Sequence, residues 1–248
     1  MIKYGLKLWS KNKEWFPKAI SLYNEGIIDF IEFFIVPNTL REVEILKEVP
    51  IVIHAPHFTF GFNISNLTED SLSIFKEQVI KTADFFNSEY IIVHAGVGKE
   101  QEVFQENVAK LQDKRILIEN MPRRGFVASD GDLCFGSTVD DLEFIKKECG
   151  LDICFDFSHA CSSAFSQGLD YKEYISTLLE KLNPFYFHIS GNEKETEQDK
   201  HMNLYESAID IKWMKEKIKD KDIFLVVETP KKDGLKNDQK NIMYLRNL

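Results

Sequence analysis

The sequence predicts a single (β/α)8 barrel of the α/β class that spans residues 1–248. Short apolar runs alternate with amphipathic segments of helical length through eight units, and this alternation implies parallel strands joined by crossover helices. Eight such units in about 250 residues is the usual size of a closed barrel. Because no Pro/Gly/Ser-rich linker, low-complexity tract or block of like charge divides the chain, we prefer one domain to two.

The expected strands are rich in Ile, Val and Phe, as strands that are buried on both faces of a parallel sheet should be. In chain order they run from Ile2 to Leu8, Ile27 to Ile35, Ile51 to His54, Tyr90 to His94, Arg115 to Glu119, Asp152 to Asp156, Phe185 to Ile189 and Ile223 to Glu228. An open doubly wound sheet is the alternative architecture. It fits less well because the segment GLKLWSKN, at the end of the first strand, has no GxGxxG phosphate loop.

Helical spacing of apolar residues marks several of the segments between the strands. The clearest runs from Glu69 to Phe86, where the apolar side chains recur every three or four residues. Gly26 and Gly150 fall where helices would stop, as left-handed caps require. The other expected helices run from Lys13 to Asn24, Thr138 to Cys149, Tyr171 to Leu182 and Glu206 to Lys219.

Composition narrows the compartment and the partners. A formal net charge of −9 argues against broad electrostatic binding to nucleic acid, although bound divalent ions would create a local positive centre. The N-terminal MIKYGLKLW lacks the apolar core of a signal peptide, and no apolar stretch is long enough to span a bilayer. The four cysteines lack CxxC spacing and are expected to be reduced thiols. We therefore expect a cytoplasmic protein with no membrane partner, and we infer no protein partner.

Imidazole and carboxylate side chains gather at the ends of the expected strands. At or just past these ends lie His54, His57, His94, Glu119, Asp156, His159, His188 and Glu228. Parallel strands bring their carboxyl ends to one mouth of a barrel, where buried charges are costly unless they are paired or bound to a metal. A lone strand-end histidine is more often structural, but the whole group indicates a multinuclear metal site. Zinc, manganese and iron(II) all accept these ligands.

The ordered motifs resemble the endonuclease IV family of zinc-dependent apurinic/apyrimidinic endonucleases, within the xylose-isomerase-like barrel superfamily. The motifs are IVIHAPHF, YIIVHAG, ILIEN, ICFDFSHA, FYFHISG, DKH and FLVVET, from about the third strand to the eighth. The combination is specific although each motif alone is weak. The resemblance implies up to three divalent ions, zinc by the usage of the family, with manganese or iron also compatible with the ligands.

The resemblance also assigns nine residues of this chain to the ions. The first ion takes His54, His94 and Glu119. The second takes Glu119 as a bridge together with Asp156, His188 and Glu228. The third takes His159, Asp199 and His201. It implies a metal-dependent phosphoesterase that hydrolyses a phosphodiester, with abasic sites in DNA as one candidate substrate. We expect Glu119 and Glu228 to be the catalytic carboxylates, and no general-base histidine is needed.

Three further residues are candidates for binding a phosphoester substrate. His57 stands where the family has a DNA-contacting tyrosine, and Arg123 and Arg124 follow the fifth strand and could meet phosphates at the barrel mouth. A solvated loop charge is the default for each arginine. Two other departures from the family pattern bear on DNA as the substrate. Lys7 stands where the family has the histidine of a G-x-H-x-S pattern, and the segment FIEFFIVPN has no counterpart of the loop arginine that enters the DNA at a damaged site. The metal chemistry is therefore better supported than damaged DNA as the substrate.

A sugar or sugar-phosphate isomerase or epimerase is the second hypothesis. An IE pair like the one that contains Glu32 is common in such enzymes of the superfamily. In this hypothesis, Glu119 and Glu228 would be the acid/base groups around one or two metals. A salt-bridged structural role is the preferred interpretation of Glu32. This hypothesis leaves the third ligand group without a role. A barrel that keeps a metal only for binding or stability is the third hypothesis, and so complete a ligand set is excessive for it.

Overall fold

Eight parallel strands close into one barrel, as the alternating pattern predicted. The computed structural model describes residues 1–98, 100–124 and 133–248. Each strand pairs with the next one along the chain, and the last pairs with the first. The strands are β1 (Ile2–Trp9), β2 (Phe30–Phe34), β3 (Ile51–His54), β4 (Ile91–His94), β5 (Ile116–Glu119), β6 (Asp152–Asp156), β7 (Tyr186–Ile189) and β8 (Ile223–Val227).

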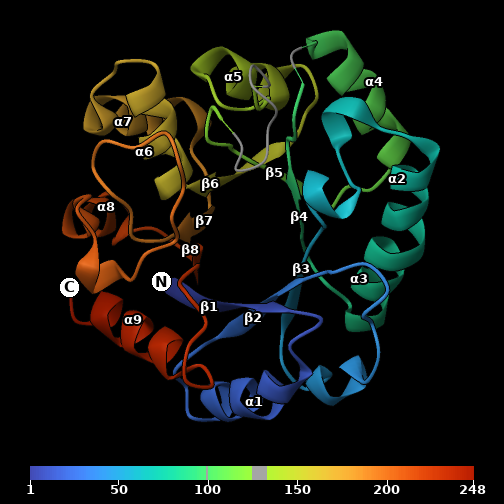
Figure 1. Cartoon of the computed structure of the whole chain (residues 1–248), viewed down its shortest axis with the longest axis vertical. Coiled ribbons are helices and arrows are strands. Elements are labelled where there is room, and N and C mark those ends of the chain that lie inside the picture. Colours follow the sequence, from blue (N-terminus) through green and yellow to red (C-terminus); the bar gives the residue numbers. More distant parts are fainter. Residues whose placement is uncertain (99, 125–132) are drawn as a thin grey trace.

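Helices surround the barrel on its outside (Figure 1). They are α1 (Phe16–Asn24), α2 (Glu69–Ile74), α3 (Lys81–Phe86), α4 (Gln101–Leu111), α5 (Val139–Lys147), α6 (Phe157–Ser166), α7 (Tyr171–Leu182), α8 (Ile211–Ile218) and α9 (Lys236–Arg246). A stretch of π-helix joins α2 to α3, so the long helix predicted here is continuous. Gly26 and Gly150 adopt positive φ angles of 70° and 68° just past α1 and α5, which confirms the predicted caps.

The sequence pattern does not predict α4, α6 or α9. α4 and α9 are polar over most of their length, and each turns only a narrow apolar edge toward the barrel, through residues such as Phe104 and Ile242. A narrow edge gives a weak helical period. α6 starts directly after β6, so no turn residues separate strand from helix in the sequence.

β2 and α8 start later in the structure than expected, and local hydrogen bonds explain both. β2 starts three residues later than expected, because the backbone N–H of Ile27 still bonds to the carbonyl of Leu22 in α1. α8 starts five residues later than expected, because the Asp210 side chain accepts a hydrogen bond of 3.0 Å from the backbone N–H of Trp213 and caps the helix there.

Two layers of side chains fill the barrel interior. An apolar plug consists of Phe30, Val52, Ile92, Leu117, Cys154, Tyr186 and Val226. Two residues further along each strand, and therefore on the same face, lie Glu32, His54, His94, Glu119, Asp156, His188 and Glu228. On β1 the same step leads from Gly5 to Lys7. Lys7 and these seven residues, which we call the ionisable layer, form the floor of the barrel mouth.

Candidate metal centre

The nine predicted ligands meet at the carboxyl mouth of the barrel. They form groups whose possible ligand atoms lie within 4.8 Å of one another. The groups are His54, His94 and Glu119; Glu119, Asp156, His188 and Glu228; and His159, Asp199 and His201. The same three sets follow from the sequence resemblance. Their role as metal ligands stays a prediction, and their local geometry bears on it.

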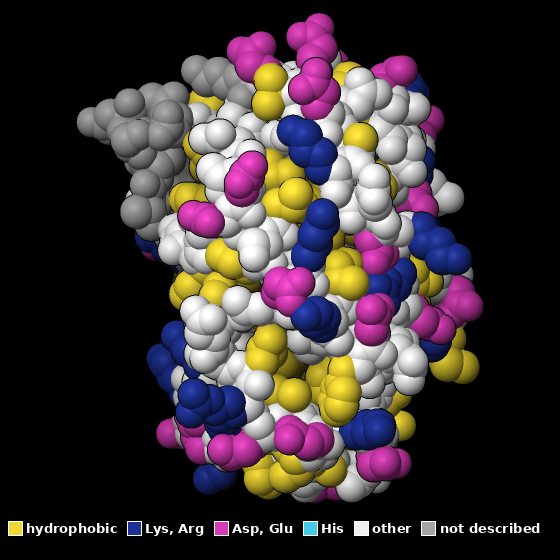
Figure 2. Space-filling view, turned by 90° about the vertical axis from the view of Figure 1, so that its right-hand side faces the viewer, with side chains coloured by type: hydrophobic (Ala, Val, Ile, Leu, Met, Phe, Trp, Pro, Cys, Tyr) yellow, Lys and Arg dark blue, Asp and Glu magenta, His cyan; other side chains and the backbone are white. Residues whose placement is uncertain are grey.

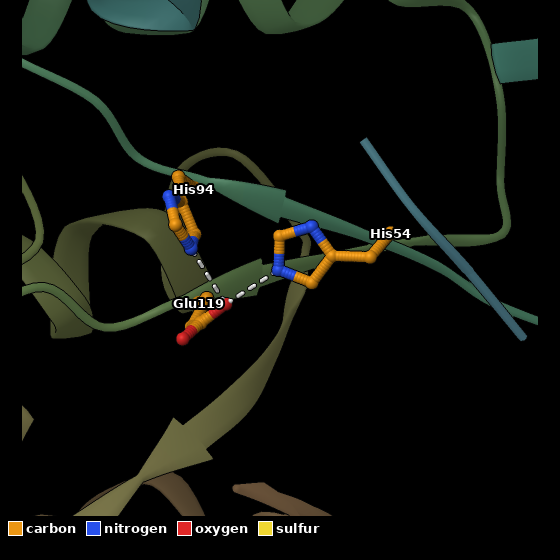
Figure 3. Close-up of side chains that lie close together, drawn as sticks. All are labelled: His54, His94 and Glu119. Carbon is orange, nitrogen blue, oxygen red and sulfur yellow. Dashed lines mark hydrogen bonds and ion pairs between the residues drawn. The ribbon is translucent and has the colours of Figure 1, made fainter. Parts of the chain in front are cut away.

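In the first group, two imidazoles face one carboxylate oxygen (Figure 3). His54 Nε2 and His94 Nε2 each lie 3.0 Å from Glu119 Oε2. The Nδ1–H of His54 donates to the carbonyl of Ala55 at 2.7 Å, which leaves Nε2 with the lone pair that a metal requires. Burial, followed by the charge of Lys7, lowers the pKa of His54 to about 4, so its imidazole is in the neutral, ligating form at pH 7.

Glu119 lies at the centre of the site and contacts two sets of imidazoles. Its Oε2 faces His54 and His94, and its Oε1 lies 3.2 Å from His188 Nδ1 and 3.3 Å from His159 Nδ1. Burial alone would raise the pKa of Glu119, but the charges of His94 and His188 outweigh burial and hold the pKa well below its usual range. A fully ionised carboxylate with its two oxygens directed at separate groups has the geometry of a bridging ligand.

In the second group, His188 lies between two carboxylates. Its Nδ1 is 2.7 Å from Glu228 Oε1, and its Nε2 is 2.7 Å from Glu32 Oε2, which also accepts a hydrogen bond from the Tyr186 hydroxyl. Glu32 therefore orients the ring from behind, as outer carboxylates do for metal-bound histidines. Its ion pair of 3.3 Å with Lys7 agrees with the salt-bridged role that we preferred. Glu32 is fully buried inside β2, however, and not at a strand end.

Asp156 and His159 are held by a residue that the sequence analysis did not single out. The Asn120 side chain accepts a hydrogen bond from the backbone N–H of Asp156, and its backbone carbonyl lies 2.8 Å from His159 Nδ1. His159 Nε2 is then directed at Asp199 Oδ2, 3.3 Å away. Asp156 Oδ1 accepts the backbone N–H of His159 and caps α6. The only sequence signal for Asn120 is its place directly after Glu119.

The third group depends on the loop before α8. His201 Nε2 contacts Asp199 Oδ2, while Asp199 Oδ1 accepts a hydrogen bond of 2.7 Å from the Ser158 hydroxyl at the start of α6. Burial would raise the pKa of Asp199, but His201 and His159 outweigh it and keep the carboxylate ionised. His201 itself has a φ angle of 45°, in the left-handed region that non-glycine residues adopt infrequently.

Amide side chains, two of them buried, hold this loop against α9. Asn241 accepts a hydrogen bond of 2.7 Å from the backbone N–H of Leu204. Asn241 and Asn237 both donate to the side-chain oxygen of Asn203, at 3.0 and 2.7 Å. Asn237 also donates to the carbonyl of Pro230, just past β8. The loop that carries His201 and the segment after Glu228 are therefore anchored by the same helix.

Lys7 lies in the ionisable layer, where sequence analysis had noted it only as a departure from a family pattern. Its Nζ is 2.5 Å from Glu228 Oε1 and 3.3 Å from Glu32 Oε1. Burial alone would lower the pKa of Lys7, but Glu228, Glu32 and Glu119 together raise it above its usual value. The ammonium group is therefore charged at every physiological pH.

Several buried polar atoms of the site lack a hydrogen-bond partner. Among the described residues they include His94 Nδ1 and Asp156 Oδ2. Glu119 Oε1, His188 Nδ1 and Asp199 Oδ2 also lack a hydrogen bond, although each faces a charged partner in an ion pair. Such atoms are rare in folded proteins because each costs about 1–3 kcal/mol, and a bound ion is one recognised explanation. Imidazole nitrogens and carboxylate oxygens are ligands that zinc, manganese and iron(II) all accept. The residues present therefore fit a multinuclear centre of divalent ions.

A cavity of about 440 Å³ opens above the site. Ligand residues line part of it, and a wall of aromatic and apolar side chains lines much of the rest. This wall consists of Trp9, Phe34, His57, Phe58, Met121, Pro122 and Pro230. The Trp9 and Phe34 rings stack with their centroids 4.8 Å apart, and Phe60 packs edge-on against both.

Sequence comparison places this site in a known family. Residues 38–248, which include all nine candidate ligands, match the sequence model described as the xylose isomerase-like TIM barrel. The chain belongs to this family. Its membership confirms the superfamily that the strand-end motifs predicted.

Proteins similar to this xylose isomerase-like barrel carry different names. A "Probable endonuclease 4" of Mycoplasmopsis synoviae is 26% identical over 216 residues, which cover 76% of this chain and 73% of the relative. One from Metamycoplasma arthritidis is 22% identical over 75% of this chain and 72% of the relative. Among solved structures, endonuclease IV from Thermus thermophilus aligns with a TM-score of 0.75 at 21% identity, covering 99% and 98% of the two chains. A D-tagatose 3-epimerase-like protein aligns with a TM-score of 0.67 at 22% identity and the same coverage.

The predicted substrate-binding residues of this xylose isomerase-like barrel lie in different environments. His57 lines the cavity, and burial, followed by the charges of His94 and His54, lowers its pKa to about 3, so that the ring is neutral. Arg124 is exposed and pairs with Glu197 at 2.9 Å. Neither Arg123 nor Arg124 is among the residues that line the cavity, so the structure brings only His57 to the ligand groups.

Proposed function

We propose that this protein is a metal-dependent hydrolase that cleaves a phosphoester with a centre of up to three divalent ions. The observation that carries the proposal is the position of Glu119, whose two oxygens face the first and second ligand groups. The third group adjoins it through His159, 3.3 Å from Glu119 Oε1. The relatives named endonuclease 4 support the same reaction class.

Different residues of this chain would bind the ions and orient the ligands in such a site. When bound, divalent ions supply Lewis acidity and lower the pKa of water toward 7. Glu119 holds the first two ligand groups together, and Glu228 reaches from the second group toward the third, with its Oε2 3.7 Å from His201 Nδ1. Asn120 and Glu32 fix the ring orientations of His159 and His188. With ions bound, each ligand imidazole would lose its proton and be committed to ligation, so none would serve as a general base.

The shape and charge of the molecule support a compact substrate. The cavity of about 440 Å³ has an aromatic wall and can enclose one phosphorylated sugar or nucleotide unit. The net charge is −9, and the face over α2, α3 and α4 carries acidic and basic side chains interspersed (Figure 2). We therefore propose a small phosphorylated compound or a nuclease of relaxed specificity, with an abasic site in DNA as one substrate to test.

A sugar isomerase or epimerase is the second candidate. The observation in its favour is that Glu119 and Glu228 face the same cavity and share His188, as paired acid/base groups around a metal would. It gives no role to the cluster of His159, Asp199 and His201, which is why we place it second.

A substrate panel separates the two candidates. Protein loaded with Zn²⁺ or Mn²⁺ would be assayed on a duplex with an abasic site, on bis-p-nitrophenyl phosphate, on p-nitrophenyl phosphate, and on free and phosphorylated ketoses. We expect hydrolysis of at least one phosphoester, with loss of the activity on chelation. Interconversion of a ketose with no hydrolysis of any phosphoester would establish the second candidate instead.

A further inference from the structure

Lys7 brings a permanent positive charge into the ionisable layer. Its side chain is only 7% exposed, and its Nζ lies over the Phe34 ring, 5.8 Å from the ring centroid. Its two ion pairs are to Glu228 Oε1 and Glu32 Oε1. A buried ammonium group with two carboxylate partners is a fixed part of the site and not a surface charge.

The ammonium group shares a ligand atom with the second metal position. Glu228 Oε1 lies 2.5 Å from Lys7 Nζ and 2.7 Å from His188 Nδ1, and both Glu228 and His188 belong to the second ligand group. A divalent ion bound by these ligands would therefore compete with the ammonium group for Glu228 Oε1. Two positive charges at one buried oxygen repel each other strongly, because the interior screens charge poorly.

The other two ligand groups differ in this respect. Among the described residues, the ion-pair partners of Glu119 are His54, His94, His159 and His188. Those of Asp199 are His159 and His201. No lysine or arginine in the described part of the chain forms an ion pair with Glu119 or Asp199. The charge of Lys7 also acts on His54 and Glu119, but its direct ion pair with a candidate ligand, Glu228, lies in the second group.

Glu32 offers the ammonium group a second place. Glu32 Oε1 is buried, has no hydrogen-bond partner and lies 3.3 Å from Lys7 Nζ. A short movement of Nζ from Glu228 toward Glu32 would free Glu228 Oε1 without leaving the ammonium group unpaired.

We propose that Lys7 is a resident counter-cation of the second metal position, so that the ion held by Glu119, Asp156, His188 and Glu228 binds most weakly of the three. Lys7 neutralises Glu228 while that position is empty and transfers to Glu32 Oε1 when the ion binds. The centre then loads in two stages, with the first and third positions filled before the second. The inference rests on the proposed metal centre but not on the identity of the substrate.

Metal titration of Lys7 variants tests this inference. Chelator-stripped protein would be titrated with Zn²⁺ against a chromophoric chelator, and with Co²⁺ while its visible absorption is followed. For the unaltered chain we expect two tight equivalents and a third at least tenfold weaker. Lys7→Met should strengthen the third equivalent tenfold or more and leave the first two nearly unchanged. Lys7→Arg, which keeps the charge, is the matched control and should retain the weak third equivalent.

The direction in which Lys7→Met changes the affinity of the third equivalent shows whether Lys7 competes with the ion or positions its ligand. If Lys7 merely positions Glu228, Lys7→Met should weaken the third equivalent, and that result would overturn the inference, as would three equivalents of equal affinity in the unaltered chain. Lys7→Gln keeps a hydrogen-bond donor to Glu228 and replaces Lys7→Met if the latter fails to fold without metal. A chain that binds no ion at all would instead refute the proposed metal centre.

Discussion

At the scale of single residues, Glu119 decides whether the ligand groups act as one centre. Glu119→Gln keeps the volume of the side chain and removes the charge that faces both imidazole sets. We expect it to lower phosphoesterase activity by more than about 100-fold, because removing a ligand should cost more than removing a residue that only orients one. We also expect less bound metal. Steady-state kinetics and elemental analysis of one preparation measure both. Glu216→Gln, an exposed residue of α8 that pairs with Lys219, is the control and should change neither. Full activity in Glu119→Gln would contradict its bridging role.

Glu32 acts through His188, so its replacement should have an intermediate effect. Glu32→Gln weakens the hydrogen bond that orients the His188 ring at 2.7 Å. We expect metal affinity to fall by about 10–100-fold while the fold is retained, because outer partners of ligating histidines have effects of this size. Competition with a chromophoric chelator measures the change. Tyr186→Phe removes the other hydrogen bond to the same oxygen and should have a smaller effect. Metal affinity that is the same in Glu32→Gln as in the unaltered chain would show that Glu32 is structural only.

His201 is the ligand that can be removed with least damage to the fold, since its side chain is 40% exposed. His201→Ala should lose one ion selectively, because the first and second ligand groups do not include it. Elemental analysis after gel filtration should show a ratio lower by one than in the unaltered chain. Loss of every ion at once would contradict the division into separate groups.

At the scale of elements, β1 packs closely against β2 at Gly5, where no side chain separates the β1 backbone from the Phe30 ring. A Cβ on Gly5 would lie 2.4 Å from the Phe30 ring, which belongs to the apolar plug. Gly5→Ala should therefore lower the free energy of unfolding by about 1–3 kcal/mol, as overpacking does. Phe30→Leu in the same chain should recover part of that loss. A double-mutant cycle by urea unfolding measures the coupling, and strictly additive effects would contradict the proposed clash.

The start of α5 depends on its N-cap. The Thr138 side chain accepts a hydrogen bond from the backbone N–H of Asp141 at 3.2 Å. Thr138→Ala should lower the free energy of unfolding by about 0.5–2 kcal/mol. Thr177→Ala, at an exposed interior position of α7, is the matched control and should be neutral or slightly stabilising, because Ala favours helix. Equal effects at the two positions would argue against the capping role.

The elements show how far sequence reasoning reaches. The strands and the long helix from Glu69 to Phe86 were predictable because buried parallel strands and amphipathic helices leave strong periods. The polar helices α4 and α9 leave weak ones. Most of the ligand positions were predictable because they lie at or just past the end of a strand. Lys7 and Asn120 were not, because their roles come from contacts across the barrel, such as that between Lys7 on β1 and Glu228 after β8.

At the scale of the whole molecule, the site links folding to protonation. In the metal-free protein, burial would lower the pKa of His159, but Asp156 and Asp199 outweigh burial and raise it to about 10, from 6.5. A raised pKa contributes stability that is fully present below about pH 6.5 and is lost as the pH rises through about 10. We therefore expect the free energy of unfolding of the metal-free protein to fall across this range. Urea unfolding of the unaltered chain and of His159→Gln, at several pH values, measures the His159 contribution, and a difference that stays constant with pH would contradict the prediction.

The central claim is that residues from β3 to β8 form one centre for several ions, and the metal-to-protein ratio tests it most directly. Native mass spectrometry of the intact chain, saturated with Zn²⁺ or Mn²⁺, gives this ratio without reference to any substrate. Three ligand groups predict that the ratio reaches three at saturation, with a two-ion species at lower metal because the second position is the weakest. A ratio that never exceeds one at saturating metal would contradict the account.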